Sequence, residues 1–237
     1  MTNSTDYSSN STASISHHTE SARRTLRKSL RTARKSLADS AQIEAANAIT
    51  TQLNEFFASF FSNHSNECSQ QTTINTASYL VNDGEVNLSP FMQQARNTLP
   101  NVRFSLPVLH PVCKGYLLFL KFDENTALVK NKYNIEEPVL ACPSVIPSSQ
   151  LDVILMPLVG FDTKGNRLGM GGGYYDRTLA FTKRTTHKPL LIGVAHDVQE
   201  VERLPIAPWD IPLNAIITPT RLLQFKWLKQ QHLRHFS

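Results

Sequence analysis

The sequence predicts an α/β protein with a largely parallel sheet in a three-layer arrangement. Strand-like apolar segments alternate with segments of helical periodicity through most of the 237 residues. Leu151–Val159 is almost continuously apolar, which is typical of a central parallel strand buried on both faces. A glycine-rich segment follows this strand directly, at the end of the sheet where parallel sheets bind ligands.

The chain opens with a polar leader, Met1–Ala22, which is rich in Ser, Thr and Asn. Such a composition cannot bury a core, so residues 1–22 are predicted to be disordered. The leader lacks the apolar stretch of a secretory signal. A transit peptide is an alternative, but Asp6, Glu20 and the late start of the arginines at Arg23 disfavour it.

Residues 23–237 are predicted to form one domain, which begins with two helices. Arg23–Leu37 reads as an amphipathic helix whose remaining surface is basic. A second helix follows, capped by Asp39 or Ser40, and ends before the polar loop Asn63–Gln71. The apolar stripe of the first helix consists of Leu26, Leu30, Ala33 and Leu37, and that of the second of Ile43, Ala46, Ile49, Leu53, Phe56 and Phe60.

Strands and helices alternate through the rest of the domain. The turn Asn82-Asp83-Gly84 ends the first strand, and Ser89-Pro90 opens a helix with Ser as the cap. Three prolines mark Pro138–Gln150 as a connecting loop. The predicted strands are Thr73–Val81, Val102–Leu109 and its near neighbour Tyr116–Phe122, Leu151–Val159, Leu190–Ala195 and Ala215–Thr218; the predicted helices are Ser89–Thr98, Gly173–Lys183 and Leu222–His235.

The composition narrows the classes of function. The formal net charge of +5 favours an anionic partner, either a nucleic acid or a small polyanion such as a nucleotide. The cysteines Cys68, Cys113 and Cys142 lie far apart, which argues against a disulfide framework or a zinc site and favours a cytoplasmic setting. No apolar run reaches the about 18 residues of a transmembrane helix.

The segment Gly160–Asp176 carries the strongest functional signal, because four of the nine glycines lie between Gly169 and Gly173. Glycines let backbone amides approach a phosphate, the following helix adds its N-terminal dipole, and Arg167 adds a positive charge. The loop is not a Walker A motif, because no Gly-Lys-Ser/Thr follows, and it is not a dinucleotide fingerprint, because Tyr174 stands where the last glycine of that motif would be. A flexible hinge is the alternative interpretation.

Asp176 lies in the first turn of the predicted helix, beside the expected phosphates. A carboxylate there suits Mg²⁺, which favours one or two carboxylates together with phosphate oxygens. On this residue alone, an acid that complements the helix dipole is an equally good interpretation.

The run Arg-Leu-Gly-Met-Gly-Gly-Gly-Tyr-Tyr-Asp-Arg, preceded by Met156–Asp162, resembles the signature of the 5-formyltetrahydrofolate cyclo-ligase family. Four further segments are similar to that family in the same order, and they are Arg23–Arg27, Tyr79–Val86, Ile192–Asp197 and Leu204–Thr218. The resemblance implies a single Rossmann-like domain. It also implies an ATP-dependent closure of 5-formyltetrahydrofolate to 5,10-methenyltetrahydrofolate.

The resemblance further implies roles for individual residues. Asp176 and Asp210 would hold Mg²⁺. The residues that would bind ATP are Arg23, Arg24, Thr25, Leu26, Arg27, Arg167, Leu168, Gly169, Met170, Gly171, Gly172, Gly173, Tyr174 and Tyr175. Those that would contact the folate are Arg27, Leu80, Glu85, Tyr133 and Tyr174, with Tyr133 able to stack on the pterin.

The chain departs from the family pattern at three positions. Arg23 stands where many members have Lys, which replaces a point donor by a planar fork. Met170 and Gly172 stand where some members carry Arg and Lys. Phosphate charge would therefore come more from Arg167 and from the backbone.

Taken singly, Glu85 can be a solvated acid, Asp210 a turn cap and Tyr133 ordinary packing. Two other functions stay open on the residues alone. One is nucleic-acid binding through the basic helices at both ends, although no binding motif is present. The other is an α/β enzyme that acts on a different phosphorylated small molecule. We expect a monomer that binds neither nucleic acid nor membrane.

Overall fold

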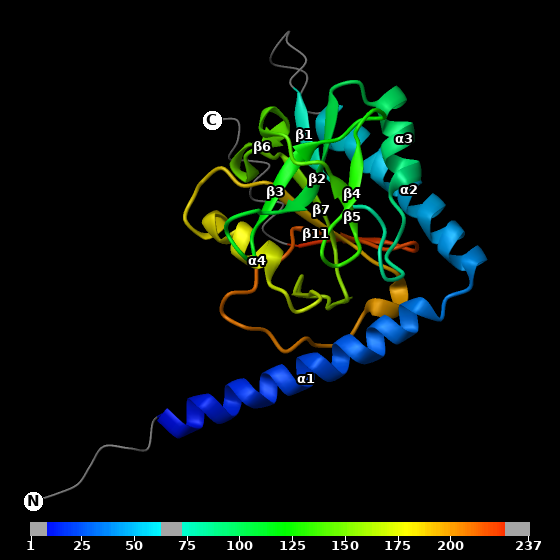
Figure 1. Cartoon of the computed structure of the whole chain (residues 1–237). Coiled ribbons are helices and arrows are strands. Elements are labelled where there is room, and N and C mark those ends of the chain that lie inside the picture. Colours follow the sequence, from blue (N-terminus) through cyan, green and yellow to red (C-terminus); the bar gives the residue numbers. More distant parts are fainter. Residues whose placement is uncertain (1–8, 63–72, 226–237) are drawn as a thin grey trace, which may run out of the picture.

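The computed structural model describes residues 9–62 and 73–225 and confirms an α/β fold built on a largely parallel sheet (Figure 1). Eight strands lie in the order β12-β11-β10-β7-β1-β2-β3-β6. The five inner strands run parallel, and they are β1 (Ile74–Ala77), β2 (Val102–Leu109), β7 (Val153–Pro157), β10 (Leu190–Val194) and β11 (Ala215–Ile217). The strands that pair antiparallel with their neighbours are β3 (Leu117–Lys121), β6 (Val145–Ile146) and β12 (Leu222–Gln224).

Both faces of the sheet are covered. One face packs on α2 (Asp39–Ser62) and α3 (Ser89–Thr98), and the other on α4 (Tyr174–Thr178), the 3-10 helix η3 (Ala180–Lys183) and loop segments. Alternate residues of β7 point into the two cores, with Val153 and Leu155 in one and Ile154 and Met156 in the other. This double burial is why the central strand reads as a continuous apolar run.

The helix α1 (Ser9–Lys35) lies across the carboxyl ends of the strands, apart from the helices on the two faces (Figure 1). It packs against η4 (Asp197–Gln199), which follows β10, and against β8 (Gly160–Phe161), which follows β7. A short hairpin joins β8 to β9 (Arg167–Leu168). The remaining elements are the hairpin of β4 (Leu128–Lys130) with β5 (Glu136–Pro138), and the 3-10 turns η1 (Cys142–Ser144) and η2 (Ser148–Gln150).

The N-terminal leader enters the described structure as part of a helix. Helix α1 begins at Ser9 and runs without a break into the domain, while residues 1–8 lie outside the described part of the chain. The disorder of residues 1–22 stays a prediction. Within α1, Arg27 donates to the carboxylate of Glu20 at 2.8 Å.

Three predictions are corrected. The predicted helix Gly173–Lys183 is divided into α4 and η3 at Leu179, whose φ and ψ of −95° and 4° end the α-helix. The predicted loop Pro138–Gln150 supplies edge strand β6. The predicted helix Leu222–His235 starts instead as strand β12, which pairs with β11, and residues 226–237 are outside the described part.

Smaller differences concern the ends and faces of helices. Helix α3 starts at Ser89 itself, without a side-chain cap, and the carboxamide of Asn87 accepts the N–H of Ser89. Ile43 is exposed although its spacing placed it on the buried face of α2, and the side chain of Phe60 lies outside the described part. Within the described residues, no helix has the length and apolar character needed to cross a membrane.

Candidate functional site

A cavity of about 1060 Å³ opens at the carboxyl ends of β1, β2 and β7. Its walls come from α1, the turn after β1, the β4–β5 hairpin, the glycine-rich loop and α4. Of the predicted site residues, those that line it are Arg23, Arg27, Leu80, Glu85, Tyr133, Arg167, Gly169, Met170, Gly171, Gly172, Gly173, Tyr174, Tyr175 and Asp176. Those that do not line it are Arg24, Thr25, Leu26, Leu168 and Asp210.

The glycine-rich loop is folded as the sequence suggests. Gly171 and Gly173 have φ values of 97° and 63°, which side-chain-bearing residues rarely adopt. Arg27 of α1 lies against this loop and donates from Nε to the carbonyl of Gly169 at 3.0 Å. Because α4 is only five residues long, its dipole contributes little, and the attraction for an anion rests on the loop amides and the arginines.

Two arginine–aspartate pairs lie beside this loop. Arg167 donates to Asp176 at 2.6 Å, and Arg23 binds Asp210 in a two-pronged contact at 2.6 and 3.1 Å. The N–H of Ile211 donates to Asp176 at 3.2 Å, which brings the two carboxylates into the same neighbourhood. Burial opposes the charge of Arg23, but the hydrogen bond and charge of Asp210 outweigh it, and the pKa of Arg23 is raised.

These carboxylates fit the oxygen chemistry of Mg²⁺ when phosphate oxygens supply the other ligands. In the described residues no group of three or more His, Cys, Asp or Glu side chains could hold a metal by itself. Each aspartate is neutralised by its own arginine instead.

Glu85 occupies a buried position at the tip of the turn after β1. Asp83 and Gly84, the central residues of that turn, both have positive φ, and the N–H of Glu85 donates to the carbonyl of Asn82. The side chain of Glu85 is 11% exposed, and burial raises its pKa to about 7. The positive charge of Arg34, 3.9 Å away, works in the opposite direction.

Arg34 holds this turn in place, and sequence reasoning assigned it no role. It is fully buried and donates to the carbonyl of Leu158 at 2.9 Å, the carbonyl of Asp83 at 2.8 Å and the carboxylate of Asp83 at 2.7 Å. Arg31 and Lys35 also pair with Asp83, whose pKa is lowered chiefly by the hydrogen bond from Arg31. In the sequence, Arg34 looked like one more cation on a solvated helix face.

Two tyrosines meet over the cavity. The hydroxyls of Tyr133 and Tyr174 are 2.7 Å apart, and their rings cross edge to face with centroids 6.2 Å apart. Tyr133 comes from the β4–β5 hairpin, which Glu137 ties to the end of β2 by accepting the N–H of Leu109. The apolar part of the cavity beside this hairpin is lined by Leu80, Leu106, Pro107, Leu109 and Ile135.

Comparisons with known proteins identify the family. The 5-formyltetrahydrofolate cyclo-ligase family matches residues 19–219. Over 149 residues, 63% of this chain and 80% of the relative, the chain is 46% identical to the 5-formyltetrahydrofolate cyclo-ligase of Escherichia coli strain K12. The enzyme of that name from Haemophilus influenzae is 40% identical over 172 residues, 73% of this chain and 90% of that one.

Solved structures give the same result. The 5,10-methenyltetrahydrofolate synthetase of Aquifex aeolicus superposes with a TM-score of 0.64 at 27% identity, over 86% of this chain and 93% of that one. The synthetase of Mycoplasma pneumoniae superposes with a TM-score of 0.60 over 83% and 98% of the two chains. At 23% identity this second likeness supports the fold alone.

Proposed function

The chain belongs to the 5-formyltetrahydrofolate cyclo-ligase family, and from that premise we propose that it converts 5-formyltetrahydrofolate to 5,10-methenyltetrahydrofolate with the consumption of ATP and a requirement for Mg²⁺. The observation that carries the proposal is a single cavity of about 1060 Å³ with two chemically different parts. Ligand sites span about 300–1,000 Å³, so this cavity lies at the upper end of that range, as expected of a site that holds two ligands that must react with each other.

The apolar part suits a pterin. Leu80, Leu106 and Ile135 offer flat aliphatic contact, while Glu85 offers a buried carboxylate to which pterin N–H groups can donate. Tyr133 and Tyr174 would close over the bound ring. The pKa of Glu85 near 7 suits a carboxylate that is fully ionised only once hydrogen-bond donors arrive.

The arginine-rich part suits a triphosphate. Arg23, Arg27 and Arg167 surround the loop Gly169–Gly173, and all of them line the cavity. An arginine presents a planar fork that matches phosphate oxygens, and the loop amides add further donors. On binding, Arg23 and Arg167 would exchange their carboxylate partners for phosphate oxygens.

The reaction needs activation, because an N-formyl group is amide-like and a poor electrophile. Transfer of the terminal phosphoryl group of ATP to the formyl oxygen breaks the bond to ADP and turns that oxygen into a leaving group. Nitrogen 10 then attacks the formyl carbon and loses its proton, and inorganic phosphate departs with the carbon–oxygen bonding electrons. The arginines would neutralise the charge that develops during transfer, and the walls would align the two ligands.

Asp176 and Asp210 would hold Mg²⁺ together with phosphate oxygens. When bound, the ion would supply positive charge to the transferring phosphoryl group. Since both carboxylates are satisfied by arginines, we expect weak binding of Mg²⁺ alone and much stronger binding together with ATP.

The test is the near-ultraviolet absorbance of the methenyl product, followed with 5-formyltetrahydrofolate and ATP, with and without Mg²⁺. We expect Mg²⁺-dependent turnover that falls by about 100-fold or more in Arg167→Ala and Asp176→Asn, the scale seen when a group that stabilises transition-state charge is removed. Arg221→Ala is the matched control, since it breaks the exposed Arg221–Glu200 pair outside the cavity. Wild-type rates in both site variants would contradict these roles, and a folded wild-type protein without product would contradict the function.

A further inference from the structure

Trp209 is exposed in a way that is unusual for its side chain. Tryptophan is highly buried on average in folded proteins, yet Trp209 is 66% exposed and lines the cavity. Its turn is held next to α1, because Arg23 donates to Asp210 and, at 3.0 Å, to the carbonyl of Pro205. A large aromatic surface thus stands free beside the arginine-rich part of the site.

The turn that carries Trp209 is fixed on several sides. The N–H of Asp210 donates to the carbonyl of Ala207 at 3.0 Å, and the carboxylate of Asp210 accepts the N–H of Ala207 at 2.8 Å. Pro208 precedes the ring and restricts the backbone. Lys183 of η3 donates to the carbonyl of Pro208 at 2.8 Å, so the turn is bound to η3 as well as to α1. The indole is therefore presented by a rigid support.

The two parts of the cavity differ in the apolar surface that they offer. The apolar part has its own walls in Leu80, Leu106 and Ile135. Around the glycine-rich loop the lining is rich in arginine and glycine, which bind phosphate, and its larger side chains are Met170, Tyr174 and Tyr175. Trp209, which lines the same cavity as Ala180 and Lys183, supplies a flat aromatic surface of the kind on which a heterocyclic base stacks.

We propose that Trp209 is the stacking platform for the purine base of the nucleotide, with the phosphates running from there past Arg23 to the glycine-rich loop. This inference rests on the proposed use of ATP and goes beyond it by naming the residue that distinguishes a nucleotide from a bare polyphosphate. Aromatic stacking holds a base through its face, and the rigid turn lowers the entropy cost of ordering the ring.

The chain provides its own reporter, because it has two tryptophans and Trp227→Phe leaves Trp209 as the only indole. In that background we would titrate a non-hydrolysable ATP analogue and inorganic tripolyphosphate, each with Mg²⁺. We expect the analogue to quench the emission of Trp209 and tripolyphosphate to leave it unchanged. Calorimetry of the otherwise wild-type chain should show that Trp209→Ala lowers the affinity for the analogue about tenfold or more and leaves the affinity for tripolyphosphate unchanged. Trp209→Phe should restore most of the lost affinity for the analogue.

Ile206→Ala is the matched control, because Ile206 is 59% exposed on the same loop but does not line the cavity. An analogue that binds without changing the emission of Trp209, or binds Trp209→Ala as tightly as wild type, overturns the platform while ATP dependence stands. Equal quenching by tripolyphosphate also overturns it. If calorimetry detects no binding of the analogue to wild type, the proposed use of ATP fails and the platform fails with it.

Discussion

At the scale of residues, the site depends on how Arg34 and Glu85 are buried together. Burial raises the pKa of Glu85, while Arg34 and the N–H of Asn82 favour the ionised form and Asp83 disfavours it. Tyr79 and Tyr175 also face Glu85, and their pKa values are raised by burial and by the charge of Glu85, so neither tyrosine ionises near neutrality. Protonation of this part of the cavity near pH 7 is therefore governed by Glu85.

This arrangement predicts a pH dependence. If ionised Glu85 accepts hydrogen bonds from the pterin, kcat/KM for 5-formyltetrahydrofolate should rise with pH along a limb near pH 7, because the carboxylate is ionised above its pKa. Arg34→Met removes the cation that lowers this pKa. The limb should then move to higher pH by about one unit or more, the effect expected of one nearby charge. Initial rates at low substrate across the pH range measure it.

Two further variants separate electrostatics from folding. Arg34→Lys keeps a positive charge while losing the planar fork, so its limb should move less than that of Arg34→Met. Lys35→Met removes another partner of Asp83, but an exposed one that does not line the cavity, and should leave the limb in place. An unshifted limb in a folded Arg34→Met protein, judged by circular dichroism, would count against this role for Arg34.

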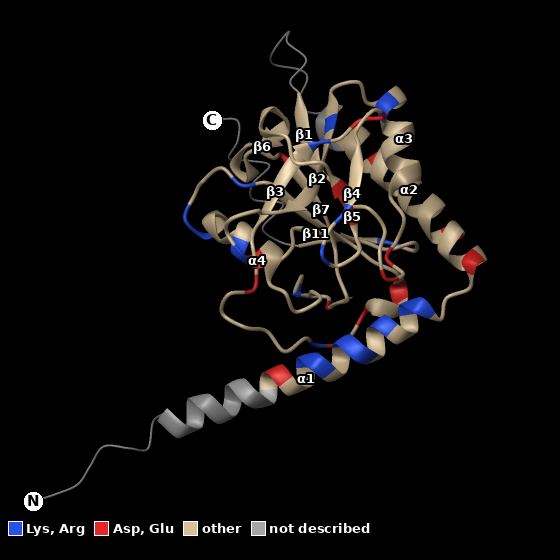
Figure 2. Cartoon of the chain, in the orientation of Figure 1, with Lys and Arg blue, Asp and Glu red and all other residues tan. Residues whose placement is uncertain are grey.

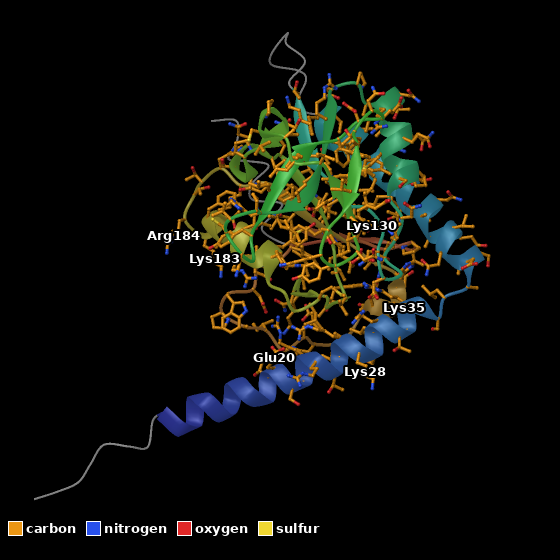
Figure 3. All side chains as sticks on the ribbon, in the orientation of Figure 1. Glu20, Lys28, Lys35, Lys130, Lys183 and Arg184 are labelled. Atoms are coloured by element: carbon orange, nitrogen blue, oxygen red, sulfur yellow. The ribbon has the colours of Figure 1, made fainter. Side chains whose placement is uncertain are left out.

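At the scale of elements, α1 is an inner wall of the domain more than a charged surface. Arg23, Arg27, Arg31 and Arg34 each bind a carboxylate or a carbonyl of the protein. Figure 2 shows Lys and Arg side by side along the part of α1 that lies beside the domain, and Lys28 extends outward from the helix (Figure 3). Much of the charge that suggested nucleic-acid binding is thus used within the fold.

The contact of α1 with β8 predicts a specific stability change. A Cβ added to Gly160 would lie 2.5 Å from Cδ1 of Leu30, so Gly160→Ala should force the buried side chain of Leu30 to shift and destabilise the protein moderately. Leu30→Ala leaves a cavity and should cost about 2–5 kcal/mol, but it also makes room for the new methyl group. The double variant should therefore lose less stability than the sum of the single variants.

Urea unfolding of the four proteins gives this coupling energy directly. Gly169→Ala is the matched control, because its new Cβ would meet nothing closer than 3.4 Å and does not face Leu30. Additive losses in the Gly160 and Leu30 pair would show that α1 and β8 are not in close contact.

At the scale of the whole molecule, features formed by neighbouring residues could be predicted from the sequence, whereas contacts between residues far apart in the chain could not. The central strand and the glycine-rich loop follow from runs of neighbouring residues, whereas Leu80, Glu85 and Tyr133 were named through the family resemblance. The structural role of Arg34 could not be predicted, because periodicity shows only the apolar face of α1. The carbonyl of Leu158 that accepts from Arg34 lies 124 residues away in the sequence. The β4–β5 hairpin was missed because β4 is exposed along its whole length and has no alternating pattern.

The start of the functional domain cannot be placed from α1 alone, because this helix runs without a break through the predicted boundary after residue 22. Deleting residues 1–18 should leave the activity and the unfolding midpoint near those of wild type, since the family match starts at residue 19 and Glu20 already lines the cavity.

Deleting residues 1–27 removes Arg23 and Arg27 and leaves Asp210 without its arginine. The KM for ATP should therefore rise about tenfold or more for each charge-assisted bond that is lost. Leu30 and Arg34 remain to hold the rest of α1 on the domain, so circular dichroism should still report a folded protein. Loss of activity in a folded protein that lacks only residues 1–18 would place those residues inside the functional domain.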